Sequence, residues 1–512
     1  MKRFLSLNII AFILINHSVS QNIKQELNDV FCNRQLMGMT ALAVCNDSII
    51  FSENIGTADY IRNIPVTDST LFRVASISKT VTATAFMILY EKGLVKLDED
   101  IGNILGYSVR NPDYPDVAIT PRMLLSHTSG IQDGTGYSGF ITDTYREKVP
   151  PKIISLLSDT GKYFSADIWQ KHSPGTYFSY CNLNFGIVAT IIEKISGVRF
   201  DIFCKKNIFD PLGMTASYKV QDFSNINNVA VLYRMNNGVW QPQADNYQGV
   251  KPDARDLSTY IAGDNGVIFG PQGGLKINAK SLAVFMMMHM NGGIYKGIRI
   301  LNPSTIKLMH SPEWLYNGKN GDNYFNLFRS WGYGFHLVNN SENGDIAVNG
   351  YKMLGHYGES YGMLGDMYFN EENKFGIIFI TNGSKAPYEE SVNTAFYAVE
   401  ADVFSVLNKY EIQPCLHSDN ILYAMNDYDD VSKNEKSKRK NIRFYLPEEG
   451  NVKCEIYNVF GLKVSAQQFY FNSYGRKQIS INTSGLSDGI YFCNINAKGN
   501  SRKFSFSITG GD

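Results

Sequence analysis

A serine and a lysine stand three residues apart in the segment Ser76-Ile77-Ser78-Lys79. A serine hydroxyl is a weak nucleophile at neutral pH and becomes effective beside a base. At the start of a helix, side chains three apart share a face, with Cβ atoms roughly 5–6 Å apart, and free backbone N–H groups can hold an oxyanion. A lysine acts as the base if burial or a nearby charge lowers its pKa from about 10.4. The segment therefore predicts a nucleophile with its base.

The spacing of this pair is a weak signal when taken alone. The same S-x-x-K pattern occurs at residues 304–307 and 437–440, where the surrounding features are missing, and we interpret both as accidental. For Ser76 by itself, an ordinary helix cap is the plain alternative. A catalytic interpretation therefore needs further segments.

A second segment, Tyr180-Cys181-Asn182, lies between a Pro-Gly-Thr turn and a predicted helix. A tyrosine at this place can relay a proton to a leaving group, and an asparagine can both orient the lysine and bind a substrate amide. The plain alternative for Tyr180 is a half-buried aromatic side chain. The segment becomes informative because it follows the serine and lysine in the chain.

A third segment, His356-Tyr357-Gly358, lies on a strand that we predict late in the domain. A glycine there lets a substrate lie against the strand edge, whose backbone N–H can bind a carbonyl oxygen. The alternative for His356 alone is a structural histidine. Three such segments in this order favour one common site.

In this order the three segments resemble the motifs of the class C β-lactamase and penicillin-binding-protein-like family of serine hydrolases. Flanking stretches are similar too, and the resemblance covers approximately residues 30–400, with the most similar of these stretches at 124–130, 174–176 and 271–275. The resemblance implies an α/β (α+β) fold. An antiparallel sheet with flanking helices would hold an inserted helical subdomain, and the site would lie between the two.

The resemblance also implies a role for each residue. By this resemblance Ser76 would be the acylated nucleophile, and Lys79 and Tyr180 would be the proton-transfer pair, in which either could be the acylation base. Asn182 would contact the lysine and the substrate. Backbone N–H groups of Ser76 and Glu359 would form the oxyanion hole, and we expect this chemistry to need neither a metal nor an organic cofactor.

Two positions depart from the family pattern. His356, which with Gly358 is expected to bind substrate, stands where many relatives have lysine. A histidine is mostly neutral near pH 7, so it binds a substrate carboxylate less reliably. This favours an esterase or peptidase acting on D-amino-acid-type substrates. Cys181 replaces a small serine or alanine and is expected to be tolerated, while the nearby His127 is expected to be structural.

Three functions remain open from the sequence. The first is a serine hydrolase that cleaves ester or amide bonds in D-amino-acid-type peptides, esters or β-lactams through an acyl-serine. The second is a D,D-carboxypeptidase or β-lactamase acting on peptidoglycan-like substrates. The third is a non-catalytic protein that binds peptidoglycan or peptides. Specificity is expected in loops at residues 133–145 and 238–266.

The elements that must position these residues can be predicted from periodicity. Strands at both ends of the domain, with helices between them, indicate one sheet built from the two termini around a helical insertion. We expect strands at 39–45, 49–52, 354–357, 363–369 and 375–381, and helices from 76 to 92 and at 182–195, 281–290 and 389–407.

Composition limits the partners. Lysine plus arginine and aspartate plus glutamate each number 48 in 512 residues, so the formal charge is zero. Neither a nucleic acid nor a polybasic membrane contact is expected. The seven cysteines form no C-x-x-C pair, which argues against a zinc or redox motif.

The domain boundaries follow from changes in composition. Residues 1–20 have the basic start, short apolar run and small residues of a signal peptide, although an uncleaved anchor is the alternative. Residues 21–410 form the hydrolase-like domain and 411–441 a solvated linker. Residues 442–512 alternate as in a β-sandwich.

This last module resembles the sorting domains of the type IX secretion system, because Leu486-Ser487-Asp488-Gly489-Ile490-Tyr491 follows their pattern. The resemblance implies contact with the secretion machinery, and a carbohydrate- or wall-binding sandwich is the alternative. The protein is therefore expected in the periplasm, on the outer surface or secreted, with no membrane insertion after signal cleavage.

Overall fold

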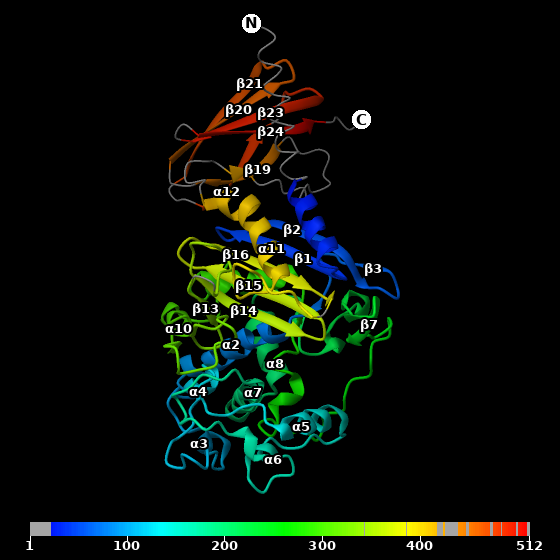
Figure 1. Ribbon diagram of the computed structural model, residues 1–512. Coiled ribbons are helices and arrows are strands. Elements are labelled where there is room, and N and C mark those ends of the chain that lie inside the picture. The colour runs from blue at the N-terminus through cyan, green and yellow to red at the C-terminus, as the bar shows by residue number, and fades with distance from the viewer. Residues whose placement is uncertain are drawn as a thin grey trace. The chain divides into compact units, whose positions relative to one another are not determined.

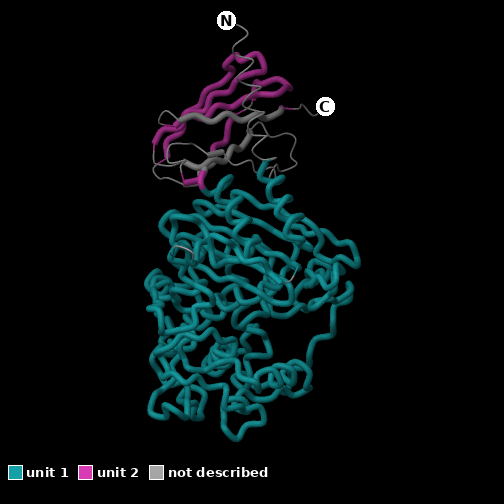
Figure 2. The backbone as a smooth tube through the Cα atoms, in the orientation of Figure 1, with its two compact units in different colours: residues 1–412 teal, residues 413–512 magenta. Residues whose placement is uncertain are grey.

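The computed structural model describes residues 22–341, 344–385, 387–416, 423–424, 439–446, 450–471, 475–482, 484–497 and 500–508. It divides into two compact units, residues 1–412 and 413–512 (Figure 2). The expected signal peptide at 1–20 and most of the expected linker at 411–441 lie outside the described residues.

The larger unit is built around an antiparallel sheet whose strands come from both ends of the domain. Within the described residues this sheet has nine strands in the order β11-β12-β13-β14-β15-β16-β1-β2-β3. The N-terminal strand β1 pairs with the late strand β16 on one side and with β2 on the other. This confirms the predicted fold class. The strands are β1 (Gly38–Cys45), β2 (Ser48–Asp59), β3 (Ile64–Pro65), β11 (Trp314–Leu315), β12 (Ser330–Trp331), β13 (His336–Val338), β14 (Met353–Ser360), β15 (Met363–Asn370) and β16 (Phe375–Thr381).

The first hairpin shows how local sequence sets the register. Asn46 and Asp47 connect β1 to β2 with φ of 47° and 65°. A two-residue hairpin turn of this type needs positive φ at both central positions, which asparagine and aspartate tolerate. The turn pairs Cys45 with Ser48 and so aligns the two strands.

Helices cover both faces of the sheet, which explains why every residue of β15 and β16 is buried. Figure 1 shows α11 (Ala398–Leu407) on one side and α2 (Ser78–Glu91), α7 (Asn182–Ser196) and α8 (Phe200–Cys204) on the other. Helix α9 (Ala279–Met290) packs against β1, β15 and β16.

The helix expected at residues 389–407 is shorter than predicted. Glu390 instead bridges Tyr397 as an antiparallel β pair. Helix α11 begins after Tyr397, whose backbone N–H donates to the carboxylate of Glu400 at 2.7 Å. This capping interaction fixes the start of the helix nine residues later than the apolar pattern indicated.

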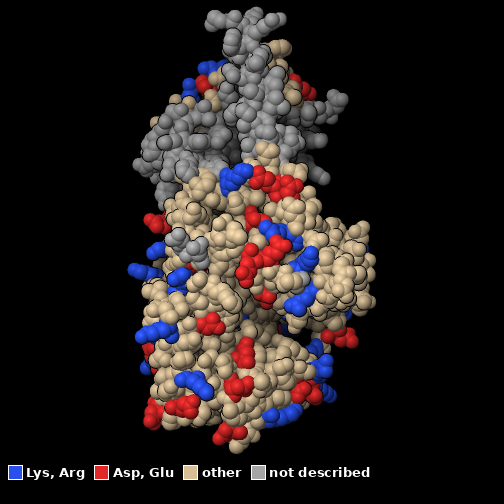
Figure 3. All heavy atoms as spheres, in the orientation of Figure 1, with Lys and Arg blue, Asp and Glu red and all other residues tan. Residues whose placement is uncertain are grey.

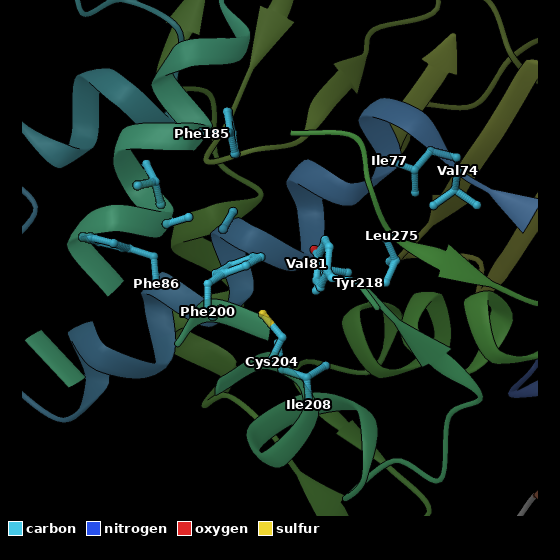
Figure 4. Packing of buried hydrophobic residues seen from close by; sticks show 14 of the residues in the cluster. Val74, Ile77, Val81, Phe86, Phe185, Phe200, Cys204, Ile208, Tyr218 and Leu275 are labelled. Carbon is cyan, nitrogen blue, oxygen red and sulfur yellow. The ribbon is translucent and has the colours of Figure 1, made fainter. Parts of the chain in front are cut away.

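Helix α2, which follows Ser76, is buried on nearly all sides. Figure 4 shows Val81 and Phe86 of α2 in one apolar cluster that also includes Phe185 of α7 and Phe200 of α8. Helix α7 ends at Gly197, whose φ of 67° is the left-handed conformation that favours glycine at a helix C-terminus. The two helices therefore form a rigid support beneath the serine and lysine.

Shorter segments complete this unit, with a helix over residues 22–33 at its start. The other helical segments are α3 (Ile101–Leu105), α4 (Pro121–Leu125), α5 (Thr135–Arg146), α6 (Ile154–Leu157) and α10 (Pro303–Met309), with single turns η1 (Ala75–Ile77), η2 (Ala166–Ile168), η3 (Lys205–Phe209), η4 (Val220–Asp222), η5 (Ile226–Asn228), η6 (Gly266–Phe269) and η7 (Asn408–Ile412). The small strands are β4 (Phe72–Arg73), β5 (Ala216–Ser217), β6 (Leu232–Asn236), β7 (Val239–Ala244), β8 (Lys276–Ile277), β9 (Ile294–Tyr295), β10 (Ile298–Arg299) and β17 (Gly383–Lys385).

The smaller unit begins with the short helix α12 (Gln413–Leu416) and is otherwise built from strands within the described residues. Its sheets run β21-β20-β23-β24 and β18-β19-β22 within the described residues. Val452, Cys454 and Ile456 point into one apolar cluster with Cys493 and Ile495, as the period-two alternation predicts. The strands are β18 (Tyr423–Ala424), β19 (Arg439–Leu446), β20 (Gly450–Asn458), β21 (Lys463–Phe471), β22 (Gly475–Asn482), β23 (Gly489–Ala497) and β24 (Asn500–Ile508).

Acidic and basic side chains are interspersed on the face shown in Figure 3, in keeping with the zero net charge. None of the helices within the described ranges has the length and apolarity needed to cross a bilayer.

The cysteines fall into two groups. Cys45 is disulfide-bonded, and so is Cys415. Among the described cysteines the free thiols are Cys32, Cys181, Cys204, Cys454 and Cys493.

Candidate active site

Ser76 lies in the single turn η1 directly before helix α2. The preceding Ala75 has a φ of 41°, which is strained for a residue with a Cβ. Strain of this kind persists where the surroundings hold it, and here the Val74 N–H donates to the carbonyl oxygen of Leu275 at 3.0 Å. The turn thus presents a half-buried serine at the start of a buried helix.

Close packing explains why residue 358 is a glycine, and this reason could not be predicted from the sequence. A Cβ placed on Gly358 would lie 2.5 Å from the carbonyl oxygen of Val74. Strand β14 therefore approaches the backbone beside Ser76 only because position 358 lacks a side chain. The neighbouring Glu359 lines the same cavity as Ser76, while the oxyanion role expected for its N–H stays a prediction.

Lys79 is fully buried, and its ammonium group contacts three acceptors. Its Nζ lies 2.9 Å from Ser76 Oγ, 2.9 Å from Asn182 Oδ1 and 2.9 Å from the carbonyl oxygen of Gln272. Burial lowers the pKa of Lys79 to about 7, although the negative charge of Asp133 acts in the opposite direction. The amine is therefore substantially neutral at mildly alkaline pH and can accept a proton from Ser76.

Tyr180 packs beside this amine. The Lys79 Nζ lies 4.9 Å from the centre of the Tyr180 ring. The buried phenol has no well-aligned hydrogen bond within the described residues, yet it is near enough to Ser76 for that hydroxyl to affect it. Burial raises the pKa of Tyr180 well above 10, and Ser76 opposes this only in part. The phenol therefore keeps its proton and suits a donor.

Asp133 positions the asparagine, and sequence reasoning missed this role. Its carboxylate accepts hydrogen bonds from the Asn182 side-chain amide at 2.8 Å and from the Leu183 backbone N–H at 2.9 Å. The bond to Leu183 satisfies a free backbone N–H at the start of α7. The bond to the side-chain amide of Asn182 turns the carbonyl oxygen of that side chain towards Lys79. No motif surrounds Asp133, so proximity in the fold is the signal that identifies it.

His127 supports Tyr180 from behind. The two rings are stacked with centroids 4.4 Å apart, and His127 Nδ1 accepts the Cys181 backbone N–H at 3.0 Å. Burial, with the charge of Lys79, lowers the pKa of His127 well below 6.5. A neutral, packed imidazole fits the structural role expected for it.

His356 is fully buried on β14 next to Tyr180, with ring centroids 6.1 Å apart. Its Nδ1 hydrogen-bonds to the carbonyl oxygen of Tyr357, and Nε2 has no partner within the described residues. Burial lowers its pKa well below 6.5, and the charge of Lys79 adds to this. The imidazole is therefore neutral, and its expected contact with substrate stays a prediction.

A cavity of about 520 Å³ opens at the serine. The predicted residues Ser76, Asn182 and Glu359 line it, whereas Tyr180 and His356 do not belong to its described walls. The segment expected as a loop at 133–145 is mostly the helix α5, on which the side chains of Phe140 and Thr144 are buried. Both expected specificity segments reach the cavity, through Tyr137, Ile141 and Tyr145 of the first and Ala244 of the second. The wall also includes charged and aromatic residues, namely Arg73, Tyr218, Phe269, Lys276 and Tyr361.

The S-x-x-K pattern at residues 304–307 has no such surroundings. Ser304 and Lys307 are exposed on α10, and Ser437 lies outside the described residues. Nor do three or more histidine, cysteine, aspartate or glutamate side chains gather to hold a metal ion in the part of the chain that the structure describes.

Comparison with known families agrees with this geometry. A family model described as Beta-lactamase matches residues 19–401. The chain belongs to the beta-lactamase family of serine hydrolases.

Two curated members similar to this beta-lactamase-family chain come from Bacillus subtilis (strain 168). Penicillin-binding protein 4* is 27% identical over 336 residues, which cover 64% of this chain and 66% of that protein. The putative penicillin-binding protein PbpX is 31% identical over 230 residues, covering 44% of this chain and 50% of that protein. The chain thus spans between half and about two thirds of the length of these relatives.

Solved structures show the same beta-lactamase fold. The D-amino acid amidase from Ochrobactrum anthropi SV3, complexed with L-phenylalanine amide, has a TM-score of 0.54 at 21% identity, covering 77% of this chain and 99% of that one. The D-alanine carboxypeptidase AmpC from Burkholderia cenocepacia has a TM-score of 0.53 at 16% identity, covering 77% and 99%. At these identities the likeness concerns the fold.

The C-terminal unit carries a second assignment. A model described as Secretion system C-terminal sorting domain matches residues 437–508. The predicted sorting module is thereby confirmed, and it implies that this beta-lactamase-family protein is exported by type IX secretion.

Proposed function

We propose that this protein is an exported serine hydrolase that cleaves ester or amide bonds through an acyl-enzyme on Ser76. The contact between the Lys79 amine and the Ser76 hydroxyl, at 2.9 Å, carries the proposal. Because burial lowers the pKa of Lys79 to about 7, the base is neutral where it must act. A binding protein without turnover has no need for such a lysine.

In the acylation step, neutral Lys79 takes the proton of Ser76 as the serine oxygen attacks the substrate carbonyl. Backbone N–H groups of Ser76 and Glu359 stabilise the oxyanion. Tyr180 passes its proton to the leaving amine or alkoxide while the scissile bond breaks, and the Lys79 ammonium returns a proton to the phenol. Water then attacks the acyl-serine, releases the acid and restores Ser76.

The substrates that we favour are amides or esters of the D-amino-acid type. A neutral, buried His356 is poorly suited to bind the carboxylate that β-lactams and D,D-peptides present. A D-amino acid amidase shares the fold, which supports D-amino-acid amides as substrates. Efficient turnover of β-lactams is therefore the less favoured version.

A fluorophosphonate probe tests the nucleophile directly. The wild type should be labelled, Ser76→Ala should not, and Ser304→Ala, which removes the exposed serine of an accidental S-x-x-K pattern, should label normally. A p-nitrophenyl ester, a D-alanine amide and a chromogenic cephalosporin, assayed side by side, rank the substrate classes. Labelling that persists in Ser76→Ala would reject the proposed nucleophile.

We also propose that the sorting unit carries the mature protein across the outer membrane. In a host with type IX secretion, the full chain should leave the periplasm, and a chain ending at residue 441 should stay there. Fractionation followed by activity assay makes the comparison. Retention of the full chain in the periplasm, with residues 442–512 intact, contradicts this destination.

A further inference from the structure

Two cations that the mechanism does not use stand opposite each other beside the nucleophile. Arg73 on β4 pairs across strands with Lys276 on β8. Like charges at directly opposed positions destabilise a sheet unless something neutralises them. Here both reach one buried carboxylate, Asp245, with Arg73 Nε and Nη2 each at 2.7 Å and the Lys276 Nζ at 3.3 Å.

One carboxylate leaves this cluster with a surplus positive charge. Asp245 already accepts two bonds from Arg73 and one from the Tyr247 hydroxyl at 2.9 Å. Among the described residues, Asp245 is the one acceptor that the Lys276 ammonium contacts, so the other N–H donors of Lys276 stay unused. The side chain of Lys276 is only 5% exposed. A buried cation without a full set of partners is unfavourable, and a ligand anion would relieve it.

Glu359 also lines the cavity but does not supply the missing charge. Its carboxylate accepts a hydrogen bond from the Tyr397 hydroxyl at 3.3 Å. Burial raises the pKa of Glu359, and the Tyr397 hydrogen bond and the charge of Arg234 act in the opposite direction. The surplus therefore faces the cavity.

The position of the two cations indicates which part of a substrate they meet. Arg73 and Lys276 line the 520 Å³ cavity together with Ser76. Tyr180, which gives its proton to the leaving group in the proposed mechanism, does not belong to the described walls of that cavity. The leaving group must therefore lie towards Tyr180, and the acyl part of the substrate is left to occupy the cavity.

We propose that Arg73 and Lys276 form a subsite that binds a carboxylate on the acyl part of the substrate. The apolar side chains of Ile141 and Phe269 in the same wall suit a short hydrocarbon spacer between that carboxylate and the scissile carbonyl. Charge-assisted hydrogen bonds from both cations hold the acid. The subsite rests on the proposed function and names its preferred acyl group.

A matched substrate pair tests the preference. The p-nitrophenyl monoester of adipic acid and the same ester with a terminal carboxamide differ in charge but hardly in shape. At pH 7 the wild type should favour the acid by about tenfold or more in kcat/KM. Lys276→Met should reduce this ratio towards one, while Lys280→Met, which removes an exposed lysine paired with Asp68, should leave it unchanged. A wild-type ratio near one, or one that Lys276→Met does not lower, overturns the subsite.

Binding to an inactive enzyme separates the subsite from the proposed function. Adipate should raise the melting temperature of Ser76→Ala more than adipamide does, and the added Lys276→Met change should abolish the difference. Equal shifts from both compounds overturn the subsite even if the esters are hydrolysed. If adipate stabilises the protein but neither ester is cleaved through Ser76, the proposed function fails and the subsite stands.

Discussion

Burial of Lys79 sets the pH at which the proposed chemistry can begin. The pKa of Lys79 is lowered to about 7, so below that pH the amine is protonated and cannot take the proton of Ser76. We expect kcat/KM for a p-nitrophenyl ester to rise through about pH 7 and then level off. The titration of His127 and His356 does not contribute to this rise in kcat/KM, because burial holds the pKa values of both residues well below 6.5.

The control for this prediction is Lys79→Arg, whose side chain stays protonated at every working pH. Its activity should fall by about a hundredfold or more at pH 8, within the range attributed to a general base. The rate of fluorophosphonate labelling, followed across pH 5 to 9, gives the same information with fluoride as the leaving group, which needs no proton from Tyr180. A profile that is flat across this range in the wild type contradicts Lys79 as the base.

The absent side chain at position 358 also makes a prediction at the residue scale. Gly358→Ala places a Cβ 2.5 Å from the Val74 carbonyl oxygen, so strand β14 must move away from Ser76. We expect a loss of about 1–3 kcal/mol in stability and a clear fall in labelling. Gly139→Ala on α5 is the control, since its Cβ would meet the Tyr163 ring at 3.8 Å and a helical alanine is favoured. Equal effects in urea unfolding would refute the close-approach argument.

At the scale of elements, the carboxylate of Asp133 links the start of α7 to the Lys79 amine through Asn182. Removing its charge in Asp133→Asn weakens the bonds to Asn182 and Leu183, at a cost of about 1 kcal/mol typical of helix caps. The negative charge also raises the pKa of Lys79, so its loss should move the acid limb of kcat/KM below pH 7. A role confined to stability would leave that limb in place.

The matched variant is Asp100→Asn, which removes the N-cap carboxylate of α3. It should cost similar stability, because Asp100 accepts the Gly102 N–H at 2.9 Å and pairs with Arg110. It should leave the pH profile of activity unchanged. A shift of the same size in both variants would assign the effect to general destabilisation.

At the scale of the whole molecule, a buried acid pair should shape stability. Asp366 on β15 and Glu400 on α11 are fully enclosed, and burial raises the pKa of Glu400 to about 8 and that of Asp366 well above its usual value. Between about pH 4.5 and 8 the folded state therefore holds protons that the unfolded chain releases. Stability attributable to this pair falls as pH rises through that window.

Urea unfolding at pH 5.5 and pH 8 measures this dependence. Glu400→Gln, which keeps a hydrogen-bonding amide without the charge, should lessen the loss of stability between the two values. Tyr397 and Glu359 face the same carboxyl and are unchanged by the substitution. An unaltered difference in Glu400→Gln contradicts the buried pair as its source.

Several features could be predicted because they depend on neighbours along the chain. The turn at Asn46 and Asp47, the end of α7 at Gly197 and the alternation in the sorting unit are each encoded within a few residues. The family motifs around Ser76, Tyr180 and His356 likewise stand in continuous segments. From such local patterns the sequence alone determined the sheet built from both ends of the domain, the family and the sorting module.

Tertiary structure decided what depends on burial and on distant segments meeting. The low pKa of Lys79 follows from complete enclosure, which no spacing records. The support from Asp133 and the charge cluster of Arg73, Asp245 and Lys276 join segments separated by many residues. Electrostatic interactions and desolvation depend on distance in space, so these properties appear only once the chain has folded.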